Sequence, residues 1–504
     1  MSQPTSAVQP GRSLGWITLG SSLHSIVSRV KSLPQTYPKI DLSYSSSQPL
    51  VQPVILNLPA NGLRLRFDGP DQRLRLIEVL DFSASSITYK STDLVKRSKS
   101  SDDDQVSGLS SQRPTFKHIY NRLFGPAYEG EYLPPDPGHS IGTYTLSYPG
   151  LAFTFPVQHK SWSDKADFVS ILSSVATGPA ISMAIFSGPS WPEARSILFN
   201  KVAAQPRSTS VNGKASDGLP DDIDDVKLYG AGRLEFVRRG APSTMVQLNE
   251  TTPQSLIAEF GPPDAIYRKN DNRISIHAGQ RTSSRRGSSL SPALDPTAVD
   301  TDHSSLQSYT DDSDVEPSDS ARSSTGGQNL ECFYNYFYHG FDALVTYPAS
   351  KSPAFPGVLH ADISDVDSSH LVVTKIILHG NVPGSYSFNR HRRCRWSIHT
   401  TIDASSPAFN SEMPFSEVSE LMKDVWRESY GSSEEERQMQ RGMVLNRGWG
   451  QSPDSSIELL GGFDDAPIKQ QGQAAVMNNT DLFGFPGMLF EVLKNDSISA
   501  LTVY

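Results

Sequence analysis

The sequence contains little cysteine and no long apolar stretch. Cys332 and Cys394 are the two cysteines among 504 residues. Two isolated thiols supply neither a disulfide framework nor a four-ligand zinc site, which fits a reducing compartment. No run of about eighteen apolar residues is present, and the first residues, MSQPTSAVQPGRS, lack the apolar core of a secretory signal. We therefore expect a cytoplasmic protein whose membrane contact, where it occurs, is peripheral.

The motifs of several common enzyme classes are also missing. The sequence has no G-x-x-x-x-G-K-[ST], no G-x-G-x-x-G after a strand, no H-E-x-x-H and no G-x-S-x-G. His339 and His379 each precede a glycine where a strand is expected to end, so we interpret them as turn residues in preference to catalytic bases. We expect no enzymatic activity, no cofactor and no metal site.

Apolar content is low for a globular chain. Hydrophobic residues make up 37% and charged residues 20%, which indicates ordered domains interrupted by polar insertions. The net charge of -9 argues against general nucleic-acid binding. The length predicts two to four domains at roughly 100–200 residues each.

Polar, serine-rich segments mark the boundaries between the expected ordered regions. We expect disorder at residues 1–12, 201–225, 279–327 and 431–475, and a linker at 96–112. The segment 279–327 is rich in Ser, Asp and Pro, and it cannot bury enough apolar surface to offset its ordering entropy. Within it, RRGSS makes Ser288 a candidate phosphorylation site for a basophilic kinase. The alternative is an unmodified, solvated loop.

One pattern occurs four times along the chain. An alternating apolar run, a turn with glycine and a second alternating run begin at Val54, Tyr144, Tyr334 and Asp481. Alternation with a period of two predicts strands with one buried face. The turn glycines are Gly62, Gly150, Gly340 and Gly487, and each suits a reversal that needs positive φ.

A helix-like segment precedes each of these hairpins. The clearest is TTPQSLIAEFGPP, with Thr252 as N-cap, Pro253 at the first helical position and Gly261 at the end. We therefore predict an α+β fold of about four repeated units, each a helix plus an antiparallel β-hairpin or meander, with long disordered surface insertions. The units are expected at residues 13–95, at 113–200, at 226–278 with 328–400, and at 410–504.

The hairpin beginning FYNYFYHGF is unusually aromatic. Aromatic side chains are common at binding hot spots, so Phe333, Tyr336, Tyr338 and Phe341 are candidate partner contacts. The alternative is that they belong to the core, where such side chains are equally common.

A dense basic cluster follows in the segment GNVPGSYSFNRHRRCRWSI. Arg390, Arg392, Arg393 and Arg395 are candidate contacts for anionic lipid headgroups or phosphate. The alternative is an exposed strand whose charges protect a sheet edge.

Long blocks of the chain resemble, in order, the phagosome (phagophore) assembly factor family. They include VILNLPANGLRLRFDGPDQRLRLIEV, LSYPGLAFTFP, YNYFYHGFDALV, KIILHGNVPGSYSFNRHRRCRWSI and FGFPGMLFEVLKNDSISALTVY. The resemblance runs from Trp16 to Tyr504. The chain departs from the family pattern in its longer insertions and in lacking the short tail that some members carry.

This resemblance implies a non-enzymatic scaffold. Members of the family are viewed as partners of a WD-repeat β-propeller protein, known in animals as breast carcinoma amplified sequence 3, at the phagophore assembly site in autophagy. Phosphoinositide contact is attributed mainly to that partner, and no catalytic or metal-binding residues are transferred. The alternatives are a direct phosphoinositide-binding peripheral membrane module and a factor in traffic from the Golgi to the cell surface.

Overall fold

The computed structural model describes most of the chain, with gaps. The described residues are 5–95, 113–163, 165–199, 222–239, 241–268, 331–347, 370–399, 409–427, 430–439, 441–446 and 479–504. The predicted linker at 96–112, the predicted insertion at 279–327 and the candidate phosphorylation site Ser288 lie outside them. Among the described residues, no helix is both long enough and apolar enough to cross a membrane.

The first half of the chain contains strands β1 to β13. The strands are β1 (Thr5–Gln9), β2 (Ser13–Leu14), β3 (Ile17–Thr18), β4 (Asp41–Ser43), β5 (Val54–Leu58), β6 (Leu63–Phe67), β7 (Leu74–Val79), β8 (Ser86–Tyr89), β9 (Thr92–Asp93), β10 (Glu131–Leu133), β11 (Ile141–Tyr148), β12 (Leu151–Gln158) and β13 (Ser182–Phe186). The helices are α1 (Leu23–Lys31), η1 (Pro59–Asn61), α2 (Phe116–His118), η2 (Ile119–Leu123), η3 (His159–Ser161), α3 (Phe168–Leu172) and α4 (Trp191–Ile197).

The second half contains strands β14 to β26. The strands are β14 (Ile223–Leu228), β15 (Arg233–Arg238), β16 (Thr244–Gln247), β17 (Ala265–Arg268), β18 (Cys332–Tyr336), β19 (Phe341–Thr346), β20 (Val372–His379), β21 (Trp396–Ile398), β22 (Phe409–Asn410), β23 (Met443–Asn446), β24 (Asn479–Phe485), β25 (Met488–Val492) and β26 (Ile498–Val503). The helices are α5 (Pro253–Phe260), α7 (Phe415–Trp426) and α8 (Ser433–Met439).

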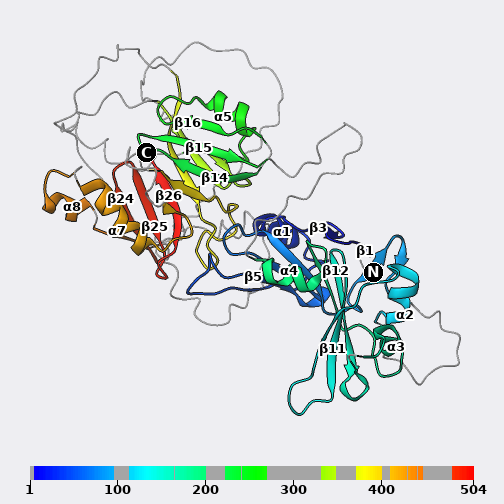
Figure 1. Ribbon diagram of the computed structural model, residues 1–504. Helices are drawn as coiled ribbons and strands as arrows, with labels where there is room; N and C mark the ends of the chain where they lie inside the picture. The colour runs from blue at the N-terminus through cyan, green and yellow to red at the C-terminus, as the bar shows by residue number, and fades with distance from the viewer. Residues whose placement is uncertain are drawn as a thin grey trace, which may run out of the picture.

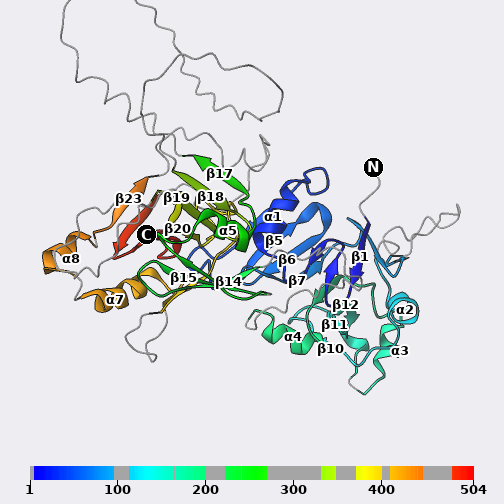
Figure 2. The ribbon, with the colours of Figure 1, turned by 90° about the horizontal axis from the view of Figure 1, so that it is seen from above.

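The two halves have the same strand order. Each has a five-stranded sheet, β3-β2-β1-β8-β9 or β16-β15-β14-β21-β22, with one parallel pair at its centre. Each also has an eight-stranded antiparallel sheet, β10-β11-β12-β13-β7-β6-β5-β4 or β17-β18-β19-β20-β26-β25-β24-β23. Each eight-stranded sheet consists of two four-stranded meanders joined through their last strands. Figure 1 shows the halves at opposite ends of the molecule, with α1 between them, and Figure 2 shows β17 and β23 at opposite edges of one sheet.

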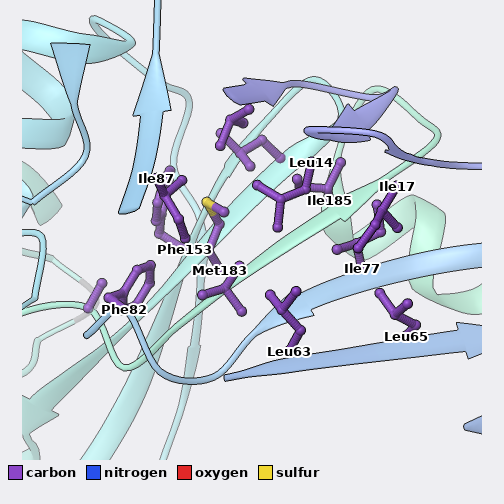
Figure 3. Packing of buried hydrophobic residues seen from close by; sticks show 14 of the residues in the cluster. Leu14, Ile17, Leu63, Leu65, Ile77, Phe82, Ile87, Phe153, Met183 and Ile185 are labelled. Carbon is purple, nitrogen blue, oxygen red and sulfur yellow. The ribbon is translucent and has the colours of Figure 1, made fainter. Parts of the chain in front are cut away.

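Within each half, the two sheets pack face to face. In the first half, Leu14, Ile17 and Ile87 of the small sheet meet Leu65 and Ile77 of the large one (Figure 3). In the second half, a corresponding cluster joins the inner faces of both sheets to α5 and α7. Burial of apolar surface between two sheets is therefore the main stabilising contribution in both halves.

The helix predicted after Thr252 is confirmed. Helix α5 begins at Pro253 after the N-cap Thr252, whose side chain accepts from the Ser255 amide, and it ends at Phe260 with Gly261 as its C-cap. Helix α1 buries Leu23, Ile26, Val27 and Val30 on one face, and these positions have the i, i+3, i+4, i+7 spacing in the sequence that predicts an amphipathic helix. The coarse expectation of a mixed α and β fold is likewise confirmed, with four multi-stranded sheets.

The four turn glycines occupy the same place in their meanders. Gly62, Gly150, Gly340 and Gly487 each connect the second strand to the third, with φ between 65° and 85°. Each of the four meanders also follows a helical segment along the chain, although none consists of the predicted hairpin alone. Sequence reasoning missed the short first strand of each meander and the whole of both five-stranded sheets.

Three of the predicted disordered segments are partly ordered. Residues 1–12 include β1, which buries Val8 and pairs in parallel with β8. Residues 431–475 include α8 and β23, and β23 extends the large sheet by pairing with β24. Residues 201–225 include the start of β14 at Ile223. These predictions were wrong there because a polar segment can be ordered by backbone pairing with a distant strand.

Gly340 and Gly487 allow a matched test of the turns. A Cβ at Gly340 would overlap the backbone oxygen of Arg392, whereas a Cβ at Gly487 would meet nothing closer than 3.5 Å. Gly340→Ala should lower the free energy of unfolding by about 3 kcal/mol, from positive φ plus overlap, and Gly487→Ala by about 1 kcal/mol, from φ alone. Urea unfolding monitored by circular dichroism measures both, and equal losses would contradict the assigned packing.

Candidate functional site

The candidate site is the junction between the two halves. Residues 380–395, which connect β20 to β21 within the second half, contact the first half. Arg393 is 4% exposed. Its guanidinium donates to the backbone oxygen of Pro70 at 2.6 Å and of Gly380 at 2.7 Å, and it lies 3.2 Å from the Glu412 carboxylate. One side chain therefore joins the β6–β7 loop of the first half to the second half.

Arg395 extends this network. It donates to Glu412 and to Asp71, both at 2.7 Å. Asp71 in turn lies 3.9 Å from Arg75, which forms a 2.5 Å ion pair with the buried Asp68. Burial raises the pKa of Glu412, but Arg393 and Arg395 outweigh that effect and hold the pKa below its usual value. The carboxylate therefore stays ionised between two cations.

Asp222 forms a second ionic connection. It accepts from Arg392 of the second half and pairs with Arg73 of the first half at 2.7 Å. Both arginine side chains are at most 7% exposed. Burial and the neighbouring Arg73 lower the pKa of Arg392 to about 10, so the guanidinium is still protonated at neutral pH.

These contacts overturn both sequence interpretations of the basic cluster. Arg392 and Arg393 are buried, and Arg395 is held by two carboxylates, so these three side chains point into the junction. They are neither presented to a lipid surface nor placed along an exposed edge. Arg390 alone of the four is exposed. The sequence could not reveal this, because a buried arginine depends on carboxylates far away along the chain.

An amide network completes the junction. The side chain of Gln72 donates to the backbone oxygen of Asn381 at 2.8 Å, and the side chain of Asn381 donates back to Gln72 at 2.8 Å. Asn389, which is fully buried, donates to Ser28 of α1 at 3.4 Å. Gln72, Asn381 and Asn389 all have positive φ, at 51°, 45° and 63°. Such backbone strain persists only where the surrounding contacts over-determine it.

His24 of α1 contacts the other side of the same segment. Its ring hydrogen-bonds to the backbone of Arg390, and it lies 5.6 Å from the ring of Tyr338 in an edge-on contact. Burial, followed by the charge of Arg392, lowers the pKa of His24 to about 4, despite the hydrogen bond to Arg390. The imidazole is therefore neutral in the folded protein at neutral pH.

A carboxylate and two imidazoles cluster beside the junction. Asp342 of β19 lies 2.9 Å from His379 and 2.8 Å from His391, each through a different oxygen. Burial raises the pKa of Asp342, but the two histidines outweigh it and hold the pKa well below its usual value. Burial and the adjacent His379 lower the pKa of His391 to about 4.

This cluster has the composition of a metal site but not its geometry. Its ligand atoms lie within 4.8 Å of one another. The two imidazole rings, however, are stacked 3.7 Å apart with planes only 11° from parallel. Ring nitrogen lone pairs lie in the ring plane, so near-parallel rings do not direct both at one ion. The arrangement fits a carboxylate that accepts one hydrogen bond from each ring. His379, which was predicted to be a turn residue, is the last residue of β20 and forms a hydrogen bond with Asp342.

The candidate partner contacts divide between core and surface. Tyr336 and Phe341 are buried and stack on each other in the second-half core. Phe333 is half-buried, and Tyr338 is 49% exposed beside His24. Cys394 is buried as well, and burial raises the pKa of its thiol to about 12, which makes it an unreactive core residue.

Comparison with known proteins identifies the family. The sequence model of the family described as Phagosome assembly factor 1 matches residues 13–291 and 309–504. The chain belongs to this family. Membership indicates a role related to phagosome assembly and confirms the resemblance noted in the sequence.

Relatives from plants and animals match three quarters or more of the chain. A PHAF1 protein of Arabidopsis thaliana is 23% identical over 99% of this chain and 92% of its own length. A PHAF1 protein of Drosophila melanogaster is 22% identical over 99% and 93%, and one of Caenorhabditis elegans is 24% identical over 75% and 73%. No solved structure matches the chain. The junction segment 380–395 lies within the matched region of the phagosome assembly factor 1 family.

Removing the charge of Asp222 tests the junction. Asp222→Asn leaves Arg73 and Arg392 buried without a counter-charge, and it should lower the free energy of unfolding by about 3–5 kcal/mol. Asp224→Asn is the matched control, because Asp224 pairs with Arg239 but is 39% exposed; it should cost less than about 1 kcal/mol. Urea unfolding measures both variants, and similar midpoints for the two would refute the buried pairing.

His24 should make stability depend on pH. Its folded pKa of about 4 lies below the unfolded value of 6.5, so the unfolded state binds the proton first. Stability is therefore complete above about pH 6.5 and is lost as the pH falls toward 4. The loss from this residue should be roughly 2 kcal/mol between pH 7.5 and pH 5.

His24→Gln should remove that part of the pH dependence, measured as urea unfolding at both pH values. His139→Gln is the control, because its side chain is exposed and its loss should change nothing. An unchanged pH dependence in His24→Gln would show that His24 is not held neutral.

Proposed function

We propose that this protein is a non-enzymatic docking body that binds a WD-repeat β-propeller protein, similar to breast carcinoma amplified sequence 3, at the phagophore assembly site in autophagy. The observation that carries the proposal is the family match over residues 13–291 and 309–504. We place the protein in the cytoplasm, recruited to that site peripherally. The proposal includes no cofactor and no nucleic-acid partner.

The arrangement of exposed apolar residues supports a docking role. Both edges of the second large sheet present such residues: Ile266 and Tyr267 on β17 are 55% and 62% exposed, and Met443 and Val444 on β23 are 69% and 60% exposed. Sheet edges with exposed apolar side chains favour association with other chains. Membrane contact fits better through the partner, because three of the four clustered arginines point into the junction.

We infer further that the four segments of helix plus four-stranded meander are repeats of one unit. Their shared element order and the placement of Gly62, Gly150, Gly340 and Gly487 support this interpretation. The repeats are not separate domains, because β13 pairs with β7 and β20 pairs with β26. Paired in this way, they build two halves, each with one continuous large sheet, that the junction joins, which suits a scaffold.

Binding of the propeller can be tested with purified proteins. The full chain and the species-matched WD-repeat protein should co-elute in size-exclusion chromatography. Tyr338→Ala should weaken binding about tenfold in calorimetry, because Tyr338 is the most exposed of the four candidate aromatic contacts.

Tyr128→Ala is the control, because Tyr128 is 93% exposed on the first half, and it should bind normally. Separate elution of the two wild-type proteins would overturn the proposed function. Co-elution that is insensitive to Tyr338→Ala would overturn only the assigned contact surface.

A further inference from the structure

A helix covers the outer face of the large sheet in the first half. Leu76, Ala152 and Phe186 project from β7, β12 and β13 on the side opposite the main core, and all are at most 2% exposed. Ala194 of α4 and Leu198, which directly follows α4, pack on them. Figure 1 shows α4 beside the strands of this half. This small cluster is separate from the main core of the first half. The outer face of the sheet is therefore buried by α4 and not by the main core.

The shared strand order assigns a counterpart to each covered position. The strand pairs next to the turns of Gly150 and Gly487 are Leu151 with Ile185 and Met488 with Val503. One residue farther along each strand, the side chains face outward. At these positions Ala152 and Ala184 of β12 and β13 correspond to Leu489 and Thr502 of β25 and β26. In the same way, Leu76 and Phe186 of β7 and β13 correspond to Lys375 and Tyr504 of β20 and β26.

In the second half these counterpart positions remain accessible. Tyr504 is 50% exposed, Lys375 is exposed, and Leu489 and Thr502 are half-buried. None of the four belongs to a buried hydrophobic cluster of the described residues. The half-buried Ile377 lies beside them, paired with Thr502. The face is thus apolar in part and open.

This face contains the positive charge of Lys375, which no carboxylate of the described residues pairs with. The Lys375 ammonium lies 5.9 Å from the centre of the Tyr504 ring. Within the part of the chain that the structure describes, Lys375 forms no ion pair. A molecule that covers this face must therefore supply a carboxylate opposite Lys375, or it buries an uncompensated charge.

We propose that this surface, defined by Lys375, Ile377, Leu489, Thr502 and Tyr504 together with the mostly buried Leu344 that pairs with Lys375, and named here the Lys375 face, binds an amphipathic helix of a partner protein. The helix presents an apolar stripe to Leu489, Ile377 and Tyr504, and an Asp or Glu within that stripe pairs with Lys375. Crossing the four strands β19, β20, β26 and β25, about 4.8 Å apart, requires a helix of roughly ten residues.

Helix α4 is the internal precedent for a helical occupant, because it covers the same positions of the first half with apolar side chains. The proposal goes beyond the proposed function, because it requires no β-propeller.

Site-specific crosslinking tests the occupant. The full chain carries the photoreactive residue p-benzoylphenylalanine in place of Thr502, is irradiated in cells, and its crosslinked peptides are sequenced by mass spectrometry. The expected result is one segment of another protein with apolar residues at helical spacing and an Asp or Glu among them. The same residue in place of Thr145, on the outer face of the first large sheet, sets the background.

Charge reversal then tests the pairing. Lys375→Glu should reduce the crosslink yield about tenfold, and replacing the mapped carboxylate by lysine should restore it. Lys90→Glu is the matched control, because Lys90 is also exposed and lies 5.2 Å from a tyrosine ring, that of Tyr89. It should leave the yield unchanged.

Four outcomes overturn the proposal. They are crosslinks only to this chain's own sequence or to a second copy, crosslinks to a segment without helical spacing, yields no higher than background, and an unchanged yield in Lys375→Glu. None of these depends on the propeller. Normal co-elution of Lys375→Glu with the WD-repeat protein separates a failure here from a failure of the proposed function.

Discussion

The buried guanidinium of Arg393 is the interaction on which the arrangement of the two halves depends. A charge at 4% exposure is tolerated only when each of its donors finds an acceptor, since desolvation costs several kcal/mol. Here the acceptors come from both halves: Pro70 from the first, and Gly380 with Glu412 from the second. If the halves separated, the β6–β7 loop would lose a charge-assisted hydrogen bond and Arg393 would lose an acceptor.

The same dependence explains why strained backbone persists at the junction. Gln72, Asn381 and Asn389 have positive φ, which costs of order 1 kcal/mol or more at each position. The reciprocal hydrogen bonds of Gln72 and Asn381 join the two loops in which these residues lie. Hydrogen bonds between buried polar groups depend on geometry, so those of Gln72, Asn381 and Arg393 favour a single relative orientation of the two halves. The junction therefore contributes specificity more than net stability.

The sequence predicted the features that depend on neighbouring residues. The cap at Thr252, the apolar face of α1 and the positive φ of Gly340 all follow from local residue types and spacing. The basic cluster was misinterpreted because its environment is not local: Asp71 is 324 residues from Arg395 along the chain. The strands β4, β10, β17 and β23 were missed for a related reason, because strands of three or four residues show too little alternation and are defined by the strand beside them.

The two halves have the same strand order in their sheets, and they differ in the loops and helices that connect and cover those sheets. The junction is built from a loop in each half, residues 68–73 after β6 in the first and 380–395 after β20 in the second, and these occupy different positions in the common strand order. The large sheet is covered by α4 in the first half and is accessible at the matching positions in the second. A repeated framework thus provides the core, and differences at loops and outer faces make the halves unequal. Because its apolar edges and the Lys375 face both belong to the second half, contacts with other proteins are expected to concentrate there, while the first half fixes its orientation through the junction.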